Sequence, residues 1–179
     1  ILVENFKTGG LSKYGLSYDQ LKDANPGLVY CSVTGFGQTG PYAERPGYDV
    51  LIQAMSGLMS TTGEPEGEPQ KSGVPISDLM SGMYAAVGIC AALRHREITG
   101  EGQHIDISML DTSVATLSMQ GMNYLASGVA PPRFGNAHPN TVPYQVFAAS
   151  DGNIILAIAT AGKFRRICDF PGLVGTVKE

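Results

Sequence analysis

One aspartate in this chain stands where a reactive carboxylate is expected. Asp111 follows a polar–apolar alternation at 104–108 that predicts a strand, and it precedes the segment 112–126, which predicts a helix. The positive end of a helix dipole stabilises a carboxylate in its ionised form. An ionised carboxylate with an unbonded oxygen can attack an activated carbonyl carbon. Asp111 is therefore predicted either to cap the helix or to serve as a nucleophile, and the two roles are compatible.

Further candidate residues follow the carboxyl ends of predicted strands. Ligands of open α/β sheets gather at that edge of the sheet. Three strand ends are visible in the sequence: Glu4-Asn5-Phe6, the glycine-rich loop that starts at Gly35, and Met109-Leu110-Asp111. We expect these three segments to lie near one another.

The glycine-rich loop has the G-x-G-x-x-G spacing of a dinucleotide-binding turn, at Gly35, Gly37 and Gly40. In that turn the last glycine opens a helix whose N–H groups hold a pyrophosphate. Here Pro41 follows at once, and no strand ending in an acidic residue comes about 20 residues later. A phosphate-binding P-loop would need lysine after Gly40. The loop is therefore predicted to have another role.

The usual motifs for hydrolysis and metal binding are absent from the sequence. There is no G-x-S-x-G, H-E-x-x-H or C-x-x-C, and His95, His104 and His138 are far apart. His95 and His104 are predicted to lie at the surface, whereas His138 is predicted either to line a site or to belong to an ordinary loop. The cysteines are widely spaced in apolar runs, which favours buried thiols in a reducing compartment over disulfides or a metal site.

Composition and charge limit the classes of function. The chain has 179 residues, a hydrophobic content of 43% and a formal net charge of −4. These values are typical of a globular protein with a substantial core, and they do not favour nucleic-acid binding. No stretch of about 18 uninterrupted apolar residues predicts a membrane span. Because the chain opens at Ile1 without a methionine, we expect it to be a segment of a longer protein.

The remaining patterns predict the elements that position these residues. Strands are predicted at 1–3, 28–34 and 104–108, and helices at 17–24, 48–60, 77–98 and 112–126. The apolar residues of 77–98 surround most of that helix, so it is predicted to be buried. Two further strands, at 144–149 and 153–159, predict a hairpin, and a short helix follows near 163–170.

Strands that alternate with helices predict an α/β fold with a mostly parallel, Rossmann-like sheet flanked by helices. The hairpin interrupts this alternation and marks the start of a smaller α+β domain. Residues 1–127 are therefore assigned to part of a large domain, 128–143 to a linking loop, and 144–179 to the start of the small domain. Residues 62–73 are polar and rich in glycine and proline, and they predict a solvated loop.

Five short segments together resemble the family III CoA-transferases, the group of formyl-CoA and carnitine CoA-transferases. They are Val3-Glu4-Asn5-Phe6-Lys7, the loop from Gly35-Phe36-Gly37 to Gly40-Pro41-Tyr42, Arg45-Pro46-Gly47-Tyr48-Asp49, Gly100-Glu101-Gly102-Gln103 and Ile107-Ser108-Met109-Leu110-Asp111. The resemblance covers nearly the whole chain, and the segments are specific in combination. The chain departs from the family pattern at Thr8, where proline is usual, and over its last ten residues. Family members are longer, so the resemblance implies a missing N-terminal CoA-binding segment and a missing C-terminal part.

The resemblance implies that Asp111 is the nucleophile of a CoA-transferase. In such enzymes the carboxylate attacks the thioester of an acyl-CoA donor, and a mixed anhydride and CoA thiolate form. The thiolate returns to give an aspartyl-CoA thioester, and a carboxylic acid acceptor then takes the CoA through a second anhydride. Backbone N–H groups are expected to stabilise the oxyanions. Coenzyme A enters as a substrate thioester, so neither a permanently bound cofactor nor a metal is implied.

The same resemblance implies further contacts around the site. Asn5 and Phe6 would contact CoA, and Lys13 would approach its phosphates. Candidate lining residues are Tyr48, Asp49, Gly135, Asn136 and His138, the last three in a loop at 135–140 that would shield the anhydride from water. The implied partners are an acyl-CoA and a carboxylic acid, with neither nucleic acid nor a membrane. The full-length protein would be an interlocked homodimer in the cytoplasm, or in the mitochondrial matrix of a eukaryote.

Two other functions are compatible with these patterns. The α-methylacyl-CoA racemases are similar in fold, but they carry an acid–base histidine in a Gly-His-Asp context, where this chain has Gly47-Tyr48-Asp49. Tyrosine, with an unperturbed pKa of about 10, is a poor base toward an α-proton at neutral pH. Asp49 is predicted to be either a helper carboxylate or the N-cap of the following helix. The second alternative is an inactive remnant or a binding module.

Overall fold

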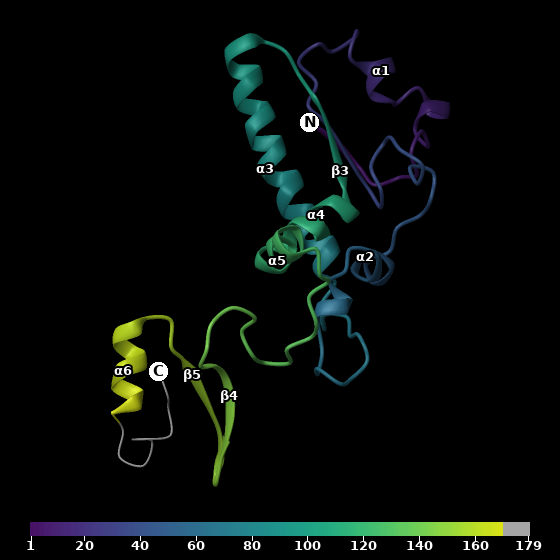
Figure 1. Cartoon of the computed structure of the whole chain (residues 1–179). Helices are drawn as coiled ribbons and strands as arrows, with labels where there is room; N and C mark the ends of the chain where they lie inside the picture. The colour runs from purple at the N-terminus through teal and green to yellow at the C-terminus, as the bar shows by residue number, and fades with distance from the viewer. Residues whose placement is uncertain (170–179) are drawn as a thin grey trace. The chain divides into compact units, whose positions relative to one another are not determined.

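The computed structural model of the chain describes residues 1–169. The chain folds into two compact units, whose helices and strands are labelled in Figure 1. The first unit comprises Ile1–Thr62 and Pro69–Pro131. The second comprises Gly63–Glu68 and, of the described residues, those at 132–169. The short segment 63–68 therefore belongs to the second unit, although the chain on both sides of it belongs to the first.

A parallel sheet forms the centre of the first unit. Its strands, in spatial order, are β1 (Leu2–Glu4), β2 (Tyr30–Thr34) and β3 (His104–Ser108). In the register, Cys31 of β2 pairs with Val3 of β1 and with Ile105 of β3. Cys31 is fully buried, as is Val29 just before the strand. The parallel α/β sheet that the sequence predicts is confirmed.

Five α-helices accompany the sheet in the first unit. They are α1 (Tyr18–Leu21), α2 (Asp49–Met55), α3 (Ile76–Thr99), α4 (Met109–Thr116) and α5 (Met119–Ser127), with 3-10 turns at Ser12–Tyr14 and Met59–Thr61. α1 begins after Ser17, as predicted, and Gln20 completes a capping box with that residue.

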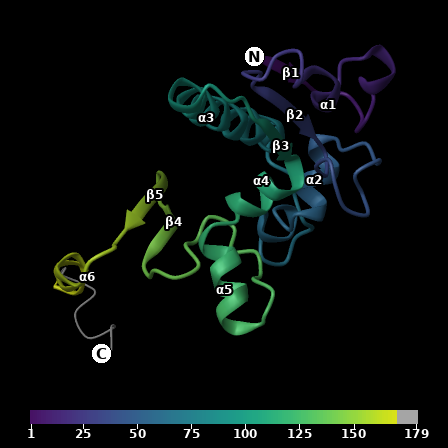
Figure 2. The same ribbon diagram turned by 90° about the horizontal axis from the view of Figure 1, so that it is seen from above.

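Helices cover both faces of the sheet (Figures 1 and 2). α3 packs on the face that carries Ile105, where a methyl group added to Gly88 would lie 3.2 Å from Cγ2 of Ile105. α1 lies on the opposite face, where the ring of Tyr18 stacks on that of His104 with 5.0 Å between the ring centroids. Glycine at position 88 thus allows α3 to approach β3 closely.

Three helices are shorter than the sequence predicts, and one of them, α1, was expected to run to residue 24 but ends at Leu21. The helix expected at 112–126 is interrupted between α4 and α5, because Ser118 has φ of 49° and ψ of −119°. This conformation cannot continue helical hydrogen bonding. The helix expected at 48–60 ends at Met55, and Gly57 beyond it has φ of 88°, a left-handed conformation in which glycine commonly follows a helix.

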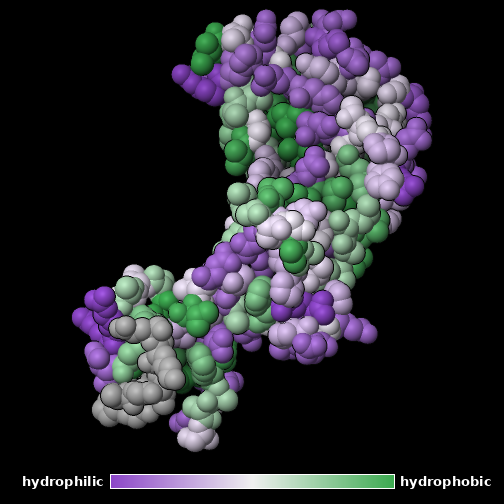
Figure 3. Space-filling model, viewed as in Figure 1, coloured by the Kyte–Doolittle hydropathy of each residue, from purple (hydrophilic) through white to green (hydrophobic). Residues whose placement is uncertain are grey.

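The sequence predicts that the large apolar residues of α3 are buried, and for several of them this prediction is wrong. The buried positions of α3 carry small side chains: Ser77, Ser81, Ala85 and Ala92. Four large apolar side chains of α3 are more than half exposed: Leu79, Met83, Val87 and Ile98. Figure 3 shows hydrophobic atoms at the surface along this helix. Small residues let α3 pack closely against its neighbours, and within residues 1–169 much of the rest of its surface stays exposed.

Among residues 1–169, α3 alone is long and apolar enough to cross a membrane, judged by length and composition. This is a weak indication, because the core helix of a globular protein passes the same test. In the structure α3 packs against β3 and α4.

An antiparallel hairpin and a short helix are the regular elements in the described part of the second unit. They are β4 (Tyr144–Ala149), β5 (Gly152–Ala157) and α6 (Ala161–Cys168). The predicted hairpin is confirmed, with Tyr144 paired to Ala157. α6 begins before the predicted position, because the Thr160 hydroxyl accepts a hydrogen bond from the backbone N–H of Lys163 at 3.4 Å. Its predicted end at residue 170 lies outside the described residues.

Arg133 holds the segment 63–68 in the second unit. Its guanidinium group donates hydrogen bonds to the backbone carbonyl oxygens of Glu64 (3.0 Å), Pro65 (3.4 Å) and Gly67. Such multiple donation is characteristic of the planar guanidinium group. This part of the predicted solvated loop therefore follows a fixed path, although the Glu64 side chain is exposed.

Candidate functional site

A cavity of about 430 Å³, which we call the α3 cavity, opens where α3 begins beside the ends of β1 and β2. Its lining residues are Asn5, Val33, Gly47, Tyr48, Asp49, Asp78, Ser81, Gly82 and Met109. Three predicted site residues, Asn5, Tyr48 and Asp49, therefore lie together. They share the cavity with a carboxylate that the sequence analysis did not select, that of Asp78.

Asp78 presents an unpaired carboxylate to this cavity. It lies in the first turn of α3, where the helix dipole favours negative charge. Partial burial raises the pKa of Asp78, and the negative charge of Asp49 raises it further. Among residues 1–169, no group forms a hydrogen bond to the Asp78 carboxylate. Both of its oxygens are therefore available to a ligand.

The carboxylate of Asp49, in contrast, is fully engaged. One oxygen accepts a hydrogen bond from the backbone N–H of Ser77 at 2.9 Å, and the other accepts one from the side-chain amide of Gln53 at 2.7 Å. The first bond satisfies a free N–H group at the start of α3. Tyr48 occupies the N-cap position of α2. One of the two predictions for Asp49, that it caps the helix that follows it, is therefore wrong, because Tyr48 is the N-cap of α2. The Asp49 carboxylate instead accepts a hydrogen bond at the start of α3.

Four buried hydroxyl groups, which we call the hydroxyl cluster, fix the start of α3 against α4. Their residues are Ser77, Ser81, Thr112 and Ser113. Ser113 Oγ donates to Ser77 Oγ at 2.9 Å, and Ser81 Oγ donates to the carbonyl oxygen of Ser77 at 2.7 Å. Ser81 Oγ also lies 2.9 Å from Thr112 Oγ1. Because Asp78 follows Ser77 directly, this cluster fixes the backbone from which the Asp78 side chain extends.

Replacing Ser113 by alanine in the full-length protein is expected to lower the free energy of unfolding by about 1–2 kcal/mol, because the buried Ser77 hydroxyl loses its partner. Urea unfolding followed by circular dichroism measures the difference. Ser12→Ala removes an exposed hydroxyl and is expected to change stability by less than about 0.5 kcal/mol. Equal losses in the two variants would contradict the structural role of the cluster.

Gly35 and Gly47 are in direct backbone contact and hold Tyr48 and Asp49 beside the end of β2. A methyl group added to Gly35 would lie 2.5 Å from Cα of Gly47, and one added to Gly47 would lie 2.4 Å from Cα of Gly35. No helix begins directly after Gly40, since the next one is α2. The loop therefore lacks the geometry of a dinucleotide-binding turn, and its glycines serve close packing.

A second cavity of about 220 Å³, which we call the loop cavity, adjoins the first. Asn5, Gly47 and Tyr48 line both cavities. The other residues that line the loop cavity are Phe6, Lys7, Thr8, Thr34, Gly35, Ala43, Arg45 and Pro46. The guanidinium carbon of Arg45 lies 4.1 Å from the centre of the Tyr42 ring, a cation–π contact that orders this side chain. Lys7 and Arg45 thus place two cationic side chains at the lining of the loop cavity.

Asp111 and Lys13 do not line the α3 cavity or the loop cavity. Asp111 is exposed in the first turn of α4, and its backbone N–H donates to the hydroxyl of Ser108 at 3.2 Å. Ser108, and not Asp111, is thus the N-cap of that helix. Lys13 is also exposed, with its ammonium group 4.8 Å from the centre of the Tyr14 ring.

Three other predicted site residues, Gly135, Asn136 and His138, belong to the second unit. Nδ1 of His138 accepts a hydrogen bond from the backbone N–H of Asn140 at 3.0 Å. The His138 ring also packs against Tyr144, with 5.0 Å between the centroids. These contacts order the loop internally, and its predicted role in shielding an anhydride stays a prediction.

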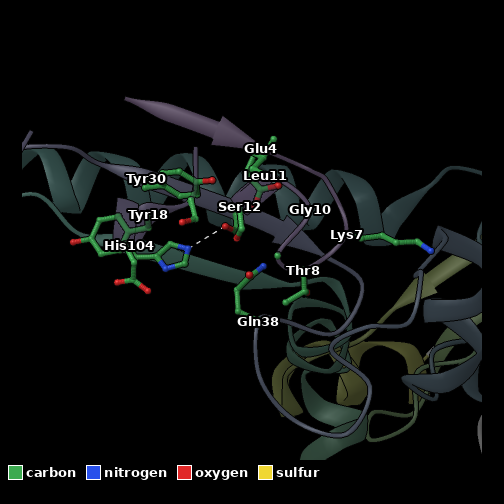
Figure 4. A pocket seen from close by; sticks show the side chains of 14 residues that line it. Glu4, Lys7, Thr8, Gly10, Leu11, Ser12, Tyr18, Tyr30, Gln38 and His104 are labelled. Carbon is green, nitrogen blue, oxygen red and sulfur yellow. Dashed lines mark hydrogen bonds between the residues drawn. The ribbon is translucent and has the colours of Figure 1, made fainter. Parts of the chain in front are cut away.

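A third cavity, of about 250 Å³, lies on the opposite face of the sheet and is drawn in Figure 4. Here His104 Nε2 lies 3.0 Å from Ser32 Oγ, and the rings of Tyr18 and Tyr30 flank the imidazole. Burial raises the pKa of Tyr30, and the charge of Glu4 adds to that effect. His104 is exposed, as the sequence predicts, but it is ordered by these partners.

Asp78 is the candidate that sequence reasoning missed. Its local signal is an aspartate in the first turn of a long apolar helix, and an ordinary helix start has the same signal. Asp49 and Asp111 also lie in first turns. Only contacts through space distinguish the three carboxylates: that of Asp49 accepts two hydrogen bonds, that of Asp111 lies outside the α3 cavity, and that of Asp78 is unpaired at its lining.

Comparison with known proteins gives the class of protein that this fold and site define. The family model for CoA-transferase family III matches residues 1–176, so the chain belongs to that family of enzymes, as the resemblance predicts. It is 54% identical over 173 residues to a succinate–glutarate CoA-transferase of Agrobacterium fabrum, covering 97% of this chain and 43% of that protein. It is 44% identical to an acetyl-CoA:oxalate CoA-transferase of Acetobacter aceti, covering 96% of this chain and 44% of that protein.

Solved structures agree with this assignment. The chain resembles the crystal structure of a CAIB/BAIF family protein from Brucella suis, with a TM-score of 0.82 and 54% sequence identity. The match covers 96% of this chain and 45% of that structure. The chain therefore spans less than half the length of the relatives that it matches.

Proposed function

We propose that the full-length protein transfers coenzyme A from an acyl-CoA donor to a carboxylic acid, with Asp78 as the nucleophile. The observation that carries this proposal is the unpaired Asp78 carboxylate in the α3 cavity. Family resemblance pointed to Asp111, but that side chain lines neither the α3 cavity nor the loop cavity. Asp49 is a poorer candidate because both of its oxygens accept hydrogen bonds.

The proposed reaction has two halves. An oxygen of Asp78 attacks the thioester carbonyl carbon, the C–S bond breaks, and a mixed anhydride and CoA thiolate form. The thiolate attacks the aspartyl carbonyl carbon of the anhydride, so the donor leaves as a carboxylate and an aspartyl-CoA thioester remains. The acceptor carboxylate then displaces CoA thiolate from this thioester to give a second anhydride. The thiolate then attacks the carbonyl carbon of the second anhydride that came from the acceptor. This step releases the new acyl-CoA and restores the Asp78 carboxylate.

No general base is needed in this sequence, because every attacking group is already an anion. What the protein supplies is position and stabilisation of the oxyanion formed at each carbonyl. The hydroxyl cluster holds the first turn of α3, and Asp49 ties that turn to α2 through Ser77. These contacts support the proposal, since they fix the turn of backbone that carries Asp78.

The loop cavity is proposed to receive part of coenzyme A. It continues from the α3 cavity through Asn5 and Tyr48, and the sequence resemblance assigns Asn5 and Phe6 to CoA contacts. Its cationic side chains, Lys7 and Arg45, are suited to the phosphate groups. They replace Lys13 in that role, because Lys13 lines neither cavity.

Small dicarboxylic acids are the proposed class of acid. The support comes from the names of relatives, which include succinate–glutarate and acetyl-CoA:oxalate transferases. A homodimer is proposed for the full-length protein, and the exposed apolar side chains of α3 support a further covering of that helix.

Trapping with hydroxylamine tests the nucleophile. The full-length protein is incubated with succinyl-CoA and then with hydroxylamine, which converts an acylated aspartate into a hydroxamate that mass spectrometry locates. We expect the modification at Asp78. Modification at Asp111 instead would restore the assignment from sequence. CoA transfer without a hydroxamate at any aspartate would rule out the covalent mechanism.

A further inference from the structure

Gly82 leaves an open space in the wall of the α3 cavity. It lies in the interior of α3 and lines the cavity together with Asp78. A methyl group added at Gly82 would meet no atom within 4 Å, whereas one added at Gly88 on the same helix would lie 3.2 Å from Cγ2 of Ile105. Packing among the described residues therefore accounts for glycine at position 88 but not at position 82.

Glycine destabilises the interior of a helix more than any residue except proline. Glycine at such a position therefore calls for an explanation in packing or in function. Gly82 follows Asp78 by four residues, so the two lie on the same face of α3, one turn apart. Side chains on a helix lean toward its N-terminus. A side chain at position 82 would therefore extend across the cavity toward the Asp78 carboxylate.

We propose that Gly82 is a specificity-determining residue, whose missing side chain makes room for the acyl group of the CoA thioester beside Asp78. This inference rests on the proposed function, since it takes Asp78 as the point of acyl attachment. Val33 and Met109 give the same cavity an apolar wall, which suits a chain of methylene groups. None of the residues that line the α3 cavity is lysine, arginine or histidine. Its charged lining residues are both acidic, Asp49 and Asp78, so the wall formed by Gly82, Val33 and Met109 is expected to discriminate acyl groups by size.

The acyl groups that depend on Gly82 are those with several methylene groups, such as glutaryl. A shorter acyl group, such as malonyl, attaches at the same aspartate without extending as far along α3. A side chain at position 82 therefore removes space that the longer group needs and the shorter group leaves empty. The consequence is a change in the preference between the two donors.

Gly82→Ala and Gly82→Val in the full-length protein test this inference. We expect the ratio of kcat/KM for glutaryl-CoA to that for malonyl-CoA to fall about tenfold or more in Gly82→Val and by a smaller factor in Gly82→Ala, since a pocket discriminates single methylene groups by about 10–200-fold. Gly73→Ala is the matched control. An added methyl group there also meets no atom within 4 Å, and position 73 lies outside the cavity. Its ratio is expected to equal that of the wild type.

A packing role for Gly82 would give a different result. If Gly82→Ala lowers kcat/KM for both donors by the same factor, or reduces the folded fraction seen by circular dichroism without changing the ratio, the inference is wrong. Binding gives a second readout that does not need turnover. Calorimetric Kd values for the two thioesters, measured in the Asp78→Asn background, are expected to show the same change of preference. If the wild type transfers no CoA, the proposed function fails. The ratio of Kd values still decides on Gly82, and an unchanged ratio overturns the inference.

Discussion

Asp78→Asn in the full-length protein is expected to lower kcat for CoA transfer by about 10³-fold or more, the scale of losing a covalent nucleophile. Asparagine has nearly the shape of aspartate, and among the described residues the Asp78 carboxylate has no hydrogen-bond partner to lose. The fold should therefore stay intact while the attacking oxygen loses its charge. Initial rates of acyl-CoA formation, with circular dichroism spectra of the same samples, check both parts of this expectation.

Asp111→Asn is the matched control for that loss. Its side chain is exposed, and Ser108 supplies the cap of α4, so the substitution is expected to leave kcat close to the wild-type value. The two variants make the same chemical change in the first turn of two different helices. If Asp111→Asn abolishes transfer and Asp78→Asn does not, the assignment by sequence resemblance is right and the geometric one is wrong.

Most elements of the fold could be predicted because each carries its own local signal. β2 is a short apolar run between Asn25-Pro26-Gly27 and the glycine-rich loop, and the hairpin turns at a polar Ser150-Asp151-Gly152. The break at Ser118 could not be predicted, because neither proline nor glycine stands there and a positive φ is uncommon for serine. The exposure of α3 was missed for another reason: apolar composition indicates that a side chain tends to be covered, but not which segment covers it.

The candidate site was only partly predictable, because its residues come from segments far apart in the sequence. Asn5, Tyr48 and Asp49 were selected through short family motifs. Local spacing does not separate Asp49, Asp78 and Asp111, which all lie in the first turn of a helix. What separates the first two is a hydrogen bond from Ser77 to Asp49, across 28 residues. A hydrogen bond between residues so far apart in the sequence cannot be predicted from the local spacing of polar and apolar residues.

Gly35→Ala is expected to have the second large effect, a loss of about 3 kcal/mol in the free energy of unfolding. The added methyl group would lie 2.5 Å from Cα and 2.7 Å from N of Gly47, and backbone atoms cannot rotate away as the end of a side chain can. Tyr48 and Asp49 follow Gly47 directly, so they must move with it. A displacement of about 1 Å in a catalytic site can cost about 10²-fold in rate, and we expect kcat/KM to fall on that scale. Urea unfolding and steady-state kinetics measure the two effects.

Gly73→Ala separates this steric effect from the general consequence of replacing glycine. No atom lies within 4 Å of the added methyl group, and the backbone at Gly73 is not left-handed. Stability is therefore expected to stay the same or to rise slightly, because alanine reduces the entropy of the unfolded chain. If Gly35→Ala proved as stable as Gly73→Ala, the contact between Gly35 and Gly47 would not hold the loop in place. Since that contact both closes the loop and presents Asp49 to the first turn of α3, stability and rate must fall together in Gly35→Ala, whereas only the rate falls in Asp78→Asn.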